Sequence, residues 1–77
     1  MKSFRFENEQ KSAIVTAFSF EDAAKINAEH PEMNLPFIGE ENGFFARKGK
    51  EAIEYTDCLV YISFYDKENS IGWAECI

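Results

Sequence analysis

Residues 12–24, SAIVTAFSFEDAA, hold the strongest local signals in the chain and decide its fold class. Residues 12–18 are rich in β-branched and small apolar side chains, which is typical of a strand. Ser19 then stands three residues before Asp22, which matches a capping box and predicts a helix that starts at Phe20. A strand followed at once by a capped helix predicts a domain that mixes α and β structure.

The predicted helix has an inner and an outer face. Small and apolar side chains repeat at helical spacing on the inner face: Phe20, Ala23, Ala24, and Asn27 or Ala28. Glu21, Lys25 and Glu29 line up on the outside. Phe18 and Ala23 are placed as a hydrophobic staple. His30-Pro31 ends the helix, because the residue before a proline avoids helical backbone angles.

Six segments read as strands. They are residues 3–6, 12–18, 37–41, 44–48, 58–65 and 70–76. Polar residues 7–11 join the first two as a hairpin, and Asn42-Gly43 is a tight-turn signal between the third and fourth. A rival reading makes residues 44–55 a second helix capped by Asn42. The chain is thus expected to be one α+β domain over residues 1–77: two strands, a helix and four strands, with a small antiparallel sheet and one helix packed on one face.

The last predicted hairpin fixes which side chains face the core. With residues 66–69 as the whole loop, Tyr65 lies opposite Ser70. One face then carries the core residues Val60, Ile62, Phe64, Ile71 and Trp73, and the other carries Leu59, Tyr61, Tyr65 and Cys76. Cys58 would join the core face, so its side chain and that of Cys76 would point to opposite sides of the sheet. We therefore expect no disulfide.

The charge of the chain favours some partners and disfavours others. Fourteen Asp and Glu oppose eight Lys and Arg, for a net charge of −6. Such a balance repels nucleic acids and anionic lipids, so direct nucleic-acid binding is not expected. We expect a protein partner with a basic surface.

Cysteine content and hydropathy bear on location. Two cysteines in so small a domain fit a reducing compartment, and residues 1–7 do not resemble an export signal. The longest uninterrupted apolar run, residues 58–62, is far below the roughly 18 residues of a membrane span. The sequence thus predicts a cytoplasmic protein that binds no membrane.

Residue types that carry chemistry are present but not in catalytic patterns. His30 is the only histidine and lacks the spacing to either cysteine that a metal site would show. No serine stands in a nucleophile motif, and the glycines do not form a phosphate-binding loop. We expect no catalytic, metal or cofactor site, and no enzymatic activity.

Two surfaces are candidates for contact with a partner. The first is an acidic and aromatic tip, Glu40, Glu41, Asn42, Phe44 and Phe45, with Glu7, Glu9 and Glu32 adding long-range attraction. The alternative is that both rings fold under the core. The second is the sheet face that carries Tyr61 and Tyr65, which would bind a partner or a second copy unless residues 31–41 cover it.

Two strands, a capped helix and further strands that end in Trp73 and Cys76 resemble the small phage-encoded inhibitors, among them several anti-CRISPR proteins. The resemblance spans the whole chain and is architectural, so no functional residue is carried over. It implies an inhibitor that occupies a basic surface of a host protein complex, where that complex binds nucleic acid. The alternatives are a homodimeric interaction module, or a small-ligand pocket between the helix and residues 31–41.

Overall fold

The structure is a computed structural model, and it describes residues 1–41 and 60–77. One helix and five strands form in these residues. The strands are β1 (Lys2–Glu7), β2 (Lys11–Ala17), β3 (Phe37–Glu40), β4 (Tyr61–Asp66) and β5 (Ile71–Cys76), and the helix is α1 (Phe20–Glu29). The predicted α+β class, with an antiparallel sheet and one helix on one face, is confirmed. The predicted strand 44–48, its Asn42-Gly43 turn and the rival helix 44–55 lie outside the described residues.

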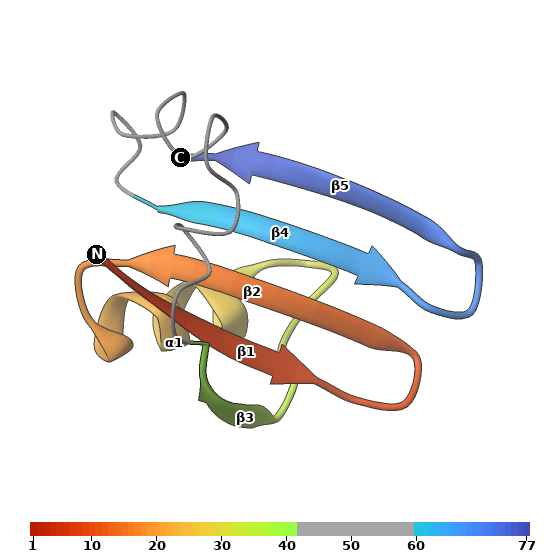
Figure 1. The fold of residues 1–77 in the computed structure, drawn as a ribbon, viewed down its shortest axis with the longest axis horizontal. Helices are drawn as coiled ribbons and strands as arrows, with labels where there is room; N and C mark the ends of the chain where they lie inside the picture. Colours follow the sequence, from red (N-terminus) through yellow and green to blue (C-terminus); the bar gives the residue numbers. More distant parts are fainter. Residues whose placement is uncertain (42–59) are drawn as a thin grey trace.

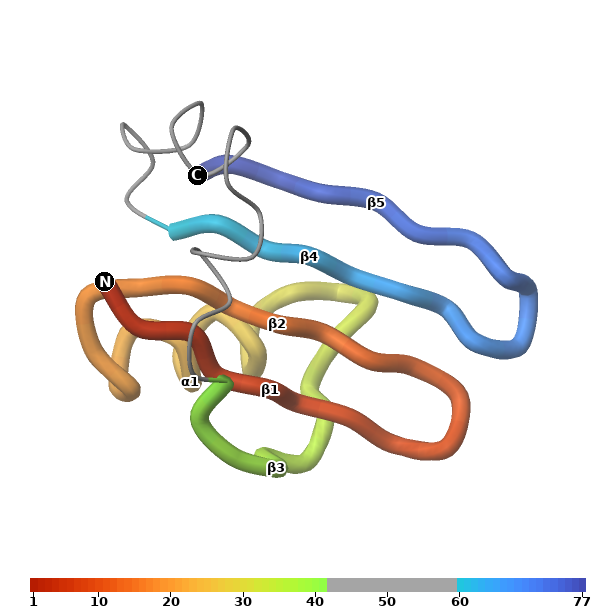
Figure 2. Tube along the Cα trace, viewed as in Figure 1, coloured from red at the N-terminus to blue at the C-terminus, as the bar shows by residue number. Residues whose placement is uncertain are grey.

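The five strands form one antiparallel sheet in the order β3-β1-β2-β4-β5 (Figure 1). Figure 2 shows that β1 lies between β2, its neighbour in sequence, and β3, which follows the helix. The pairing of β3 with β1 shifts register between Arg5 and Phe6, so this edge strand is short and irregular. Helix α1 lies across β1 and β2 on one side of the sheet, as Figure 1 shows.

The local signals of residues 12–24 act as expected, with one exception. The Ser19 hydroxyl accepts a hydrogen bond from the Asp22 N–H at 3.2 Å, so the predicted cap of α1 is confirmed. His30 has extended backbone angles and ends the helix, as predicted. The exception is the staple of Phe18 and Ala23, which stays a prediction: Phe18 is 65% exposed, whereas Ala23 is buried.

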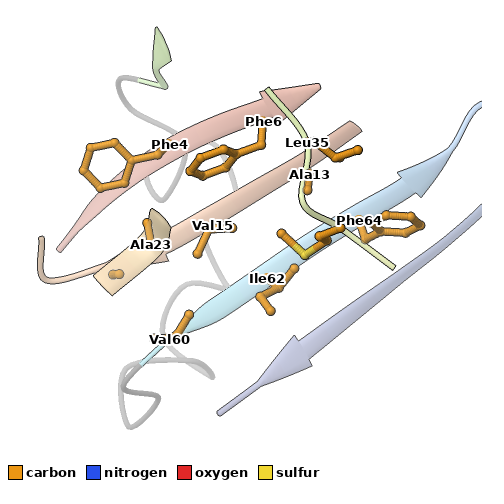
Figure 3. Packing of buried hydrophobic residues seen from close by; sticks show 11 residues of the cluster. Phe4, Phe6, Ala13, Val15, Ala23, Leu35, Val60, Ile62 and Phe64 are labelled. Atoms are coloured by element: carbon orange, nitrogen blue, oxygen red, sulfur yellow. The ribbon is translucent and has the colours of Figure 1, made fainter. Parts of the chain in front are cut away.

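The core lies between the sheet and the helix. It consists of Phe4, Phe6, Ala13, Val15, Ala17, Ala23, Met33, Leu35, Val60, Ile62 and Phe64, with Ile26 and Trp73 packed against it. Figure 3 shows the labelled side chains of β1, β2 and β4 on the same side as Ala23 and Leu35. Successive side chains of a strand alternate between faces, so every second residue of these strands enters the core.

Asn27 fastens the chain that follows the helix. Its amide nitrogen donates to the Leu35 carbonyl oxygen at 2.9 Å, and its amide oxygen accepts from the Leu35 N–H at 3.0 Å. All of these groups are buried. The segment after α1 therefore closes over the core, and Met33 and Leu35 are buried in it. The ligand pocket between the helix and residues 31–41 stays a prediction.

The register of the last hairpin differs from the expected one by two residues. Tyr65 lies opposite Gly72, not Ser70. Asp66 belongs to the strand, and its carboxylate accepts the N–H groups of Glu68 and Asn69, so the turn closes one residue later than expected. A shift of two preserves the alternation, so the assignment of Val60, Ile62, Phe64 and Trp73 to the core is confirmed, whereas Ile71 is 60% exposed.

The expectation that no disulfide forms is wrong. Cys76 is disulfide-bonded, and the only other cysteine of the sequence, Cys58, lies outside the described residues. The expectation extended the alternation of the strand back to residue 58, but β4 begins at Tyr61, and alternation holds only within a strand. The argument for a reducing compartment from two free thiols loses its basis, and the cytoplasmic location stays a prediction.

Replacing Asn27 with alanine should lower the free energy of unfolding by about 1–3 kcal/mol, because two buried backbone groups of Leu35 lose their partner. Lys25→Ala, on the exposed side of the same helix, should change it by no more than about 0.5 kcal/mol. Denaturant titration followed by circular dichroism measures both. Equal losses in the two variants would contradict the fastening role of Asn27.

Candidate partner-binding surface

Only part of the predicted acidic tip lies in the described residues. Asn42, Phe44 and Phe45 lie outside the described residues. Glu40 is exposed at the end of β3, with its carboxylate 3.9 Å from the Lys2 ammonium. Glu41 instead receives two hydrogen bonds from the Arg5 guanidinium, at 3.1 and 3.3 Å. Glu41 is therefore committed to a contact within the chain.

Arg5 joins Glu41 to a larger set of polar side chains, here called the Arg5 network: Arg5, Glu7, Ser12, Glu41 and Lys67. Glu7 receives hydrogen bonds from Arg5 at 3.0 Å and from Ser12 at 3.1 Å. Its other oxygen accepts from the Lys67 ammonium at 2.7 Å. The network lies on the sheet face opposite α1 and balances two carboxylates with two cations.

The Arg5 network changes the acidity of its members. Hydrogen bonds from Lys67, then from Arg5 and Ser12, lower the pKa of Glu7 from 4.5 to about 2. The hydrogen bond to Glu41 raises the pKa of Arg5. Glu7 and Glu41 thus carry charges that are compensated locally, and they add little to the long-range attraction expected of them. Glu9 and Glu32 are exposed, as expected.

The two tyrosines of the other predicted surface differ in accessibility. Tyr61 is 4% exposed, whereas Tyr65 is 46% exposed. The same face buries Ser3 and Thr16, whose hydroxyls are 2.7 Å apart, together with Ile14. Tyr61 therefore has almost no surface to offer a partner, and Tyr65 alone of the pair is displayed.

One group of free carboxylates lies on α1. Glu21, Asp22 and Glu29, here called the acidic helix face, are exposed, and no described cation lies within 4.0 Å of their carboxylates. The last turn of α1 contains Glu29 and no basic residue. A carboxylate there faces the negative end of the helix dipole, which is unfavourable for the helix. The position of Glu29 therefore does not serve helix stability.

A groove of about 380 Å³ runs beside the acidic helix face. Its lining combines apolar and charged side chains: Phe18, Asp22, Lys25, Ile26, Glu29 and Val60. Ile26 and Val60 belong to the core or pack against it, and the exposed Phe18 borders the groove. An apolar lining beside carboxylates suits the long stem and cationic head of an arginine or lysine side chain.

A stack of aromatic rings connects the end of α1 to β5. Trp73 stacks on Phe64 at a centroid distance of 4.8 Å and on His30 at 5.2 Å. His30 Nε2 lies 3.2 Å from a Glu75 oxygen, and its Nδ1 accepts from the Glu32 N–H. With Nδ1 accepting, Nε2 carries the proton and donates to Glu75. The His30 side chain is largely buried and is hydrogen-bonded on both ring nitrogens.

Two further properties of the described part of the chain bear on function. Its His, Cys, Asp and Glu side chains form no group of three or more that could hold a metal ion. Within residues 1–41 and 60–77, no helix has the length and apolar character needed to cross a membrane.

No protein-family model, curated protein or solved structure matches this chain.

The acidity of Glu7 should depend on Lys67. In the folded protein the pKa of Glu7 is about 2, lower than its ordinary value of 4.5. The contribution of Glu7 to stability is therefore present above pH 4.5 and is lost as the pH falls toward 2. Lys67→Gln should raise the pKa of Glu7 toward 4.5, and carboxyl NMR titration measures it. Lys11→Gln is the control, because it removes a cation of β2 that does not belong to the Arg5 network. An equal response to both variants would contradict the assigned pairing.

Proposed function

We propose that this chain is a small protein-binding inhibitor that docks an acidic surface on a basic surface of a host protein complex. The observation that carries the proposal is the unequal treatment of charge on the two sides of the sheet. Carboxylates of the Arg5 network are matched by cations, whereas those of the acidic helix face have no described cation within 4.0 Å. Unmatched charge is available to attract and orient a partner.

The proposal shifts the expected contact from the tip at residues 40–45 to α1. The whole net charge of −6 falls on residues 1–41 and 60–77, since residues 42–59 hold three basic and three acidic residues. The groove beside α1 adds an apolar contact that a basic side chain of the partner would fill. Glu9 and Glu32 are exposed, with no described cation within 4.0 Å, and add to the long-range attraction.

Inhibition by occupation fits this surface better than catalysis does. A basic surface that binds nucleic acid attracts phosphates through long-range electrostatics. An acidic protein that binds the same surface competes with the nucleic acid without copying its backbone. The architectural resemblance to phage-encoded anti-defence inhibitors points to the same mode of action, and no cofactor is required for it.

Reversing the charge at position 29 tests the proposal. Glu29→Lys should lower the affinity for the partner roughly tenfold or more, because a like-charge contact at an interface costs several kcal/mol. The variant should fold as well as the native protein, since a cation suits the last turn of α1. Glu68→Lys makes the same charge change in the β4–β5 turn, away from the groove, and is the matched control.

The measurement is retention of host-lysate proteins on immobilised native and variant chains, with elution by a salt gradient and affinity measurements on the retained protein. A basic protein held by the native and Glu68→Lys chains, and released early from Glu29→Lys, is the expected result. Equal retention by all three chains, unaffected by salt, would exclude docking through the acidic helix face.

A further inference from the structure

Within residues 1–41 and 60–77, strand β5 is an edge of the sheet that lacks the usual protection. Figure 1 shows it along one side of the sheet, and β4 is its only strand neighbour in the described chain. Its six residues contain no proline, no lysine and no bulge, and Glu75 is its single charge. Edge strands without such features pair readily with other strands. The opposite edge, β3, has four residues and an irregular register.

The hydrogen-bond pattern shows which backbone groups of β5 face outward. Val60 and Ile77 exchange both of their backbone hydrogen bonds, at 3.2 and 2.8 Å. In an antiparallel ladder such pairs alternate with pairs that form no bonds. Ile71, Trp73 and Glu75 therefore direct their N–H and C=O groups to β4, whereas Gly72 and Ala74 direct theirs to the open edge. Gly72 and Ala74 are also exposed.

We infer that β5 pairs with β5 of a second copy of this chain, antiparallel and about a two-fold axis at Trp73. In this register, Gly72 of each copy pairs with Ala74 of the other and forms two backbone hydrogen bonds, four in total. The two sheets become one continuous sheet. Helix α1 lies over β1 and β2 in each copy, away from the junction, so the helices do not obstruct the pairing.

Charge disfavours the register with its axis at Ala74. An axis at Trp73 places Glu75 opposite Ile71 of the second copy, and the two Glu75 residues are four positions apart, roughly 14 Å along the strands. An axis at Ala74 would halve that separation to roughly 7 Å, which is inside the Debye length of about 8 Å at physiological salt. Within its own copy, the Glu75 carboxylate also accepts a hydrogen bond from His30 Nε2. Ile71, which is 60% exposed, gains Trp73 of the second copy as a diagonal neighbour on the same face.

The pairing is independent of the proposed function, and salt distinguishes the two. Each copy carries a net charge of −6, so added salt should strengthen self-association by screening the repulsion. Docking on a basic partner should weaken under the same change. If self-association is absent, docking on a basic partner can still be tested, and the reverse also holds.

Sedimentation velocity at increasing protein concentration, up to several hundred micromolar, tests the inference. The native chain should shift from monomer to dimer, more so at high salt. Ala74→Pro should remain monomeric, because proline removes an outward N–H and is tolerated on an edge strand. Ala74→Val keeps that N–H and should dimerise like the native chain.

A charge pair at position 71 tests the register without proline. Ile71→Glu sets a carboxylate opposite Glu75 of the second copy and should weaken the dimer roughly two- to thirtyfold, whereas Ile71→Lys should strengthen it by a similar factor. Both changes are at an exposed position, and circular dichroism verifies folding. A monomer at every concentration and salt, or a dimer that responds equally to Ile71→Glu and Ile71→Lys, would overturn the inference.

Discussion

The structure depends on the strict alternation of side chains along β1, β2 and β4, which gathers the core on a single face of the sheet. Phe6, Val15 and Ile62 are almost completely buried there, beneath α1 and the segment that Asn27 fastens. A slip of one residue in any of these strands would move its apolar side chains to the other face. The small side chain of Ala23 is fully buried and allows α1 to lie close to the sheet.

The same alternation distributes the charge. Residues excluded from the core face of β1 and β2 include Arg5, Glu7 and Ser12, and cross-strand neighbours on one face can interact directly. Together with Glu41 and Lys67, these side chains form hydrogen bonds and ion pairs in which the charges cancel. The acidic helix face has no such partners, so part of the excess negative charge is exposed on α1. The alternation of side chains along the strands therefore determines both the position of the core and the pairing of charges on the opposite face of the sheet.

The parts of the fold that could be predicted from the sequence are the local ones. The capping signal of Ser19 and Asp22 defines the start of α1 within four residues of sequence. The predicted faces of β4 and β5 are correct although the predicted register differs by two residues, because side chains alternate with a period of two. The pairing of β3 with β1 and the bond from Arg5 to Glu41, 36 positions apart, depend on tertiary contacts that no local pattern encodes. The outer side of the helix could be predicted from Glu21, Lys25 and Glu29, but an exposed helix side with charges is common. The contrast with Glu7 and Glu41, whose carboxylates are paired with cations, appears only in the structure.

Residue-resolved amide hydrogen exchange in dilute solution tests the central claim most directly, because it reports which strands lie inside the sheet and which backbone groups face an open edge. The account predicts the slowest exchange in β2 and β4, and an alternation in β5 in which Trp73 and Glu75 exchange slowly while Gly72 and Ala74 exchange fast. Slow exchange concentrated in α1, or protection in β5 without alternation, would contradict it.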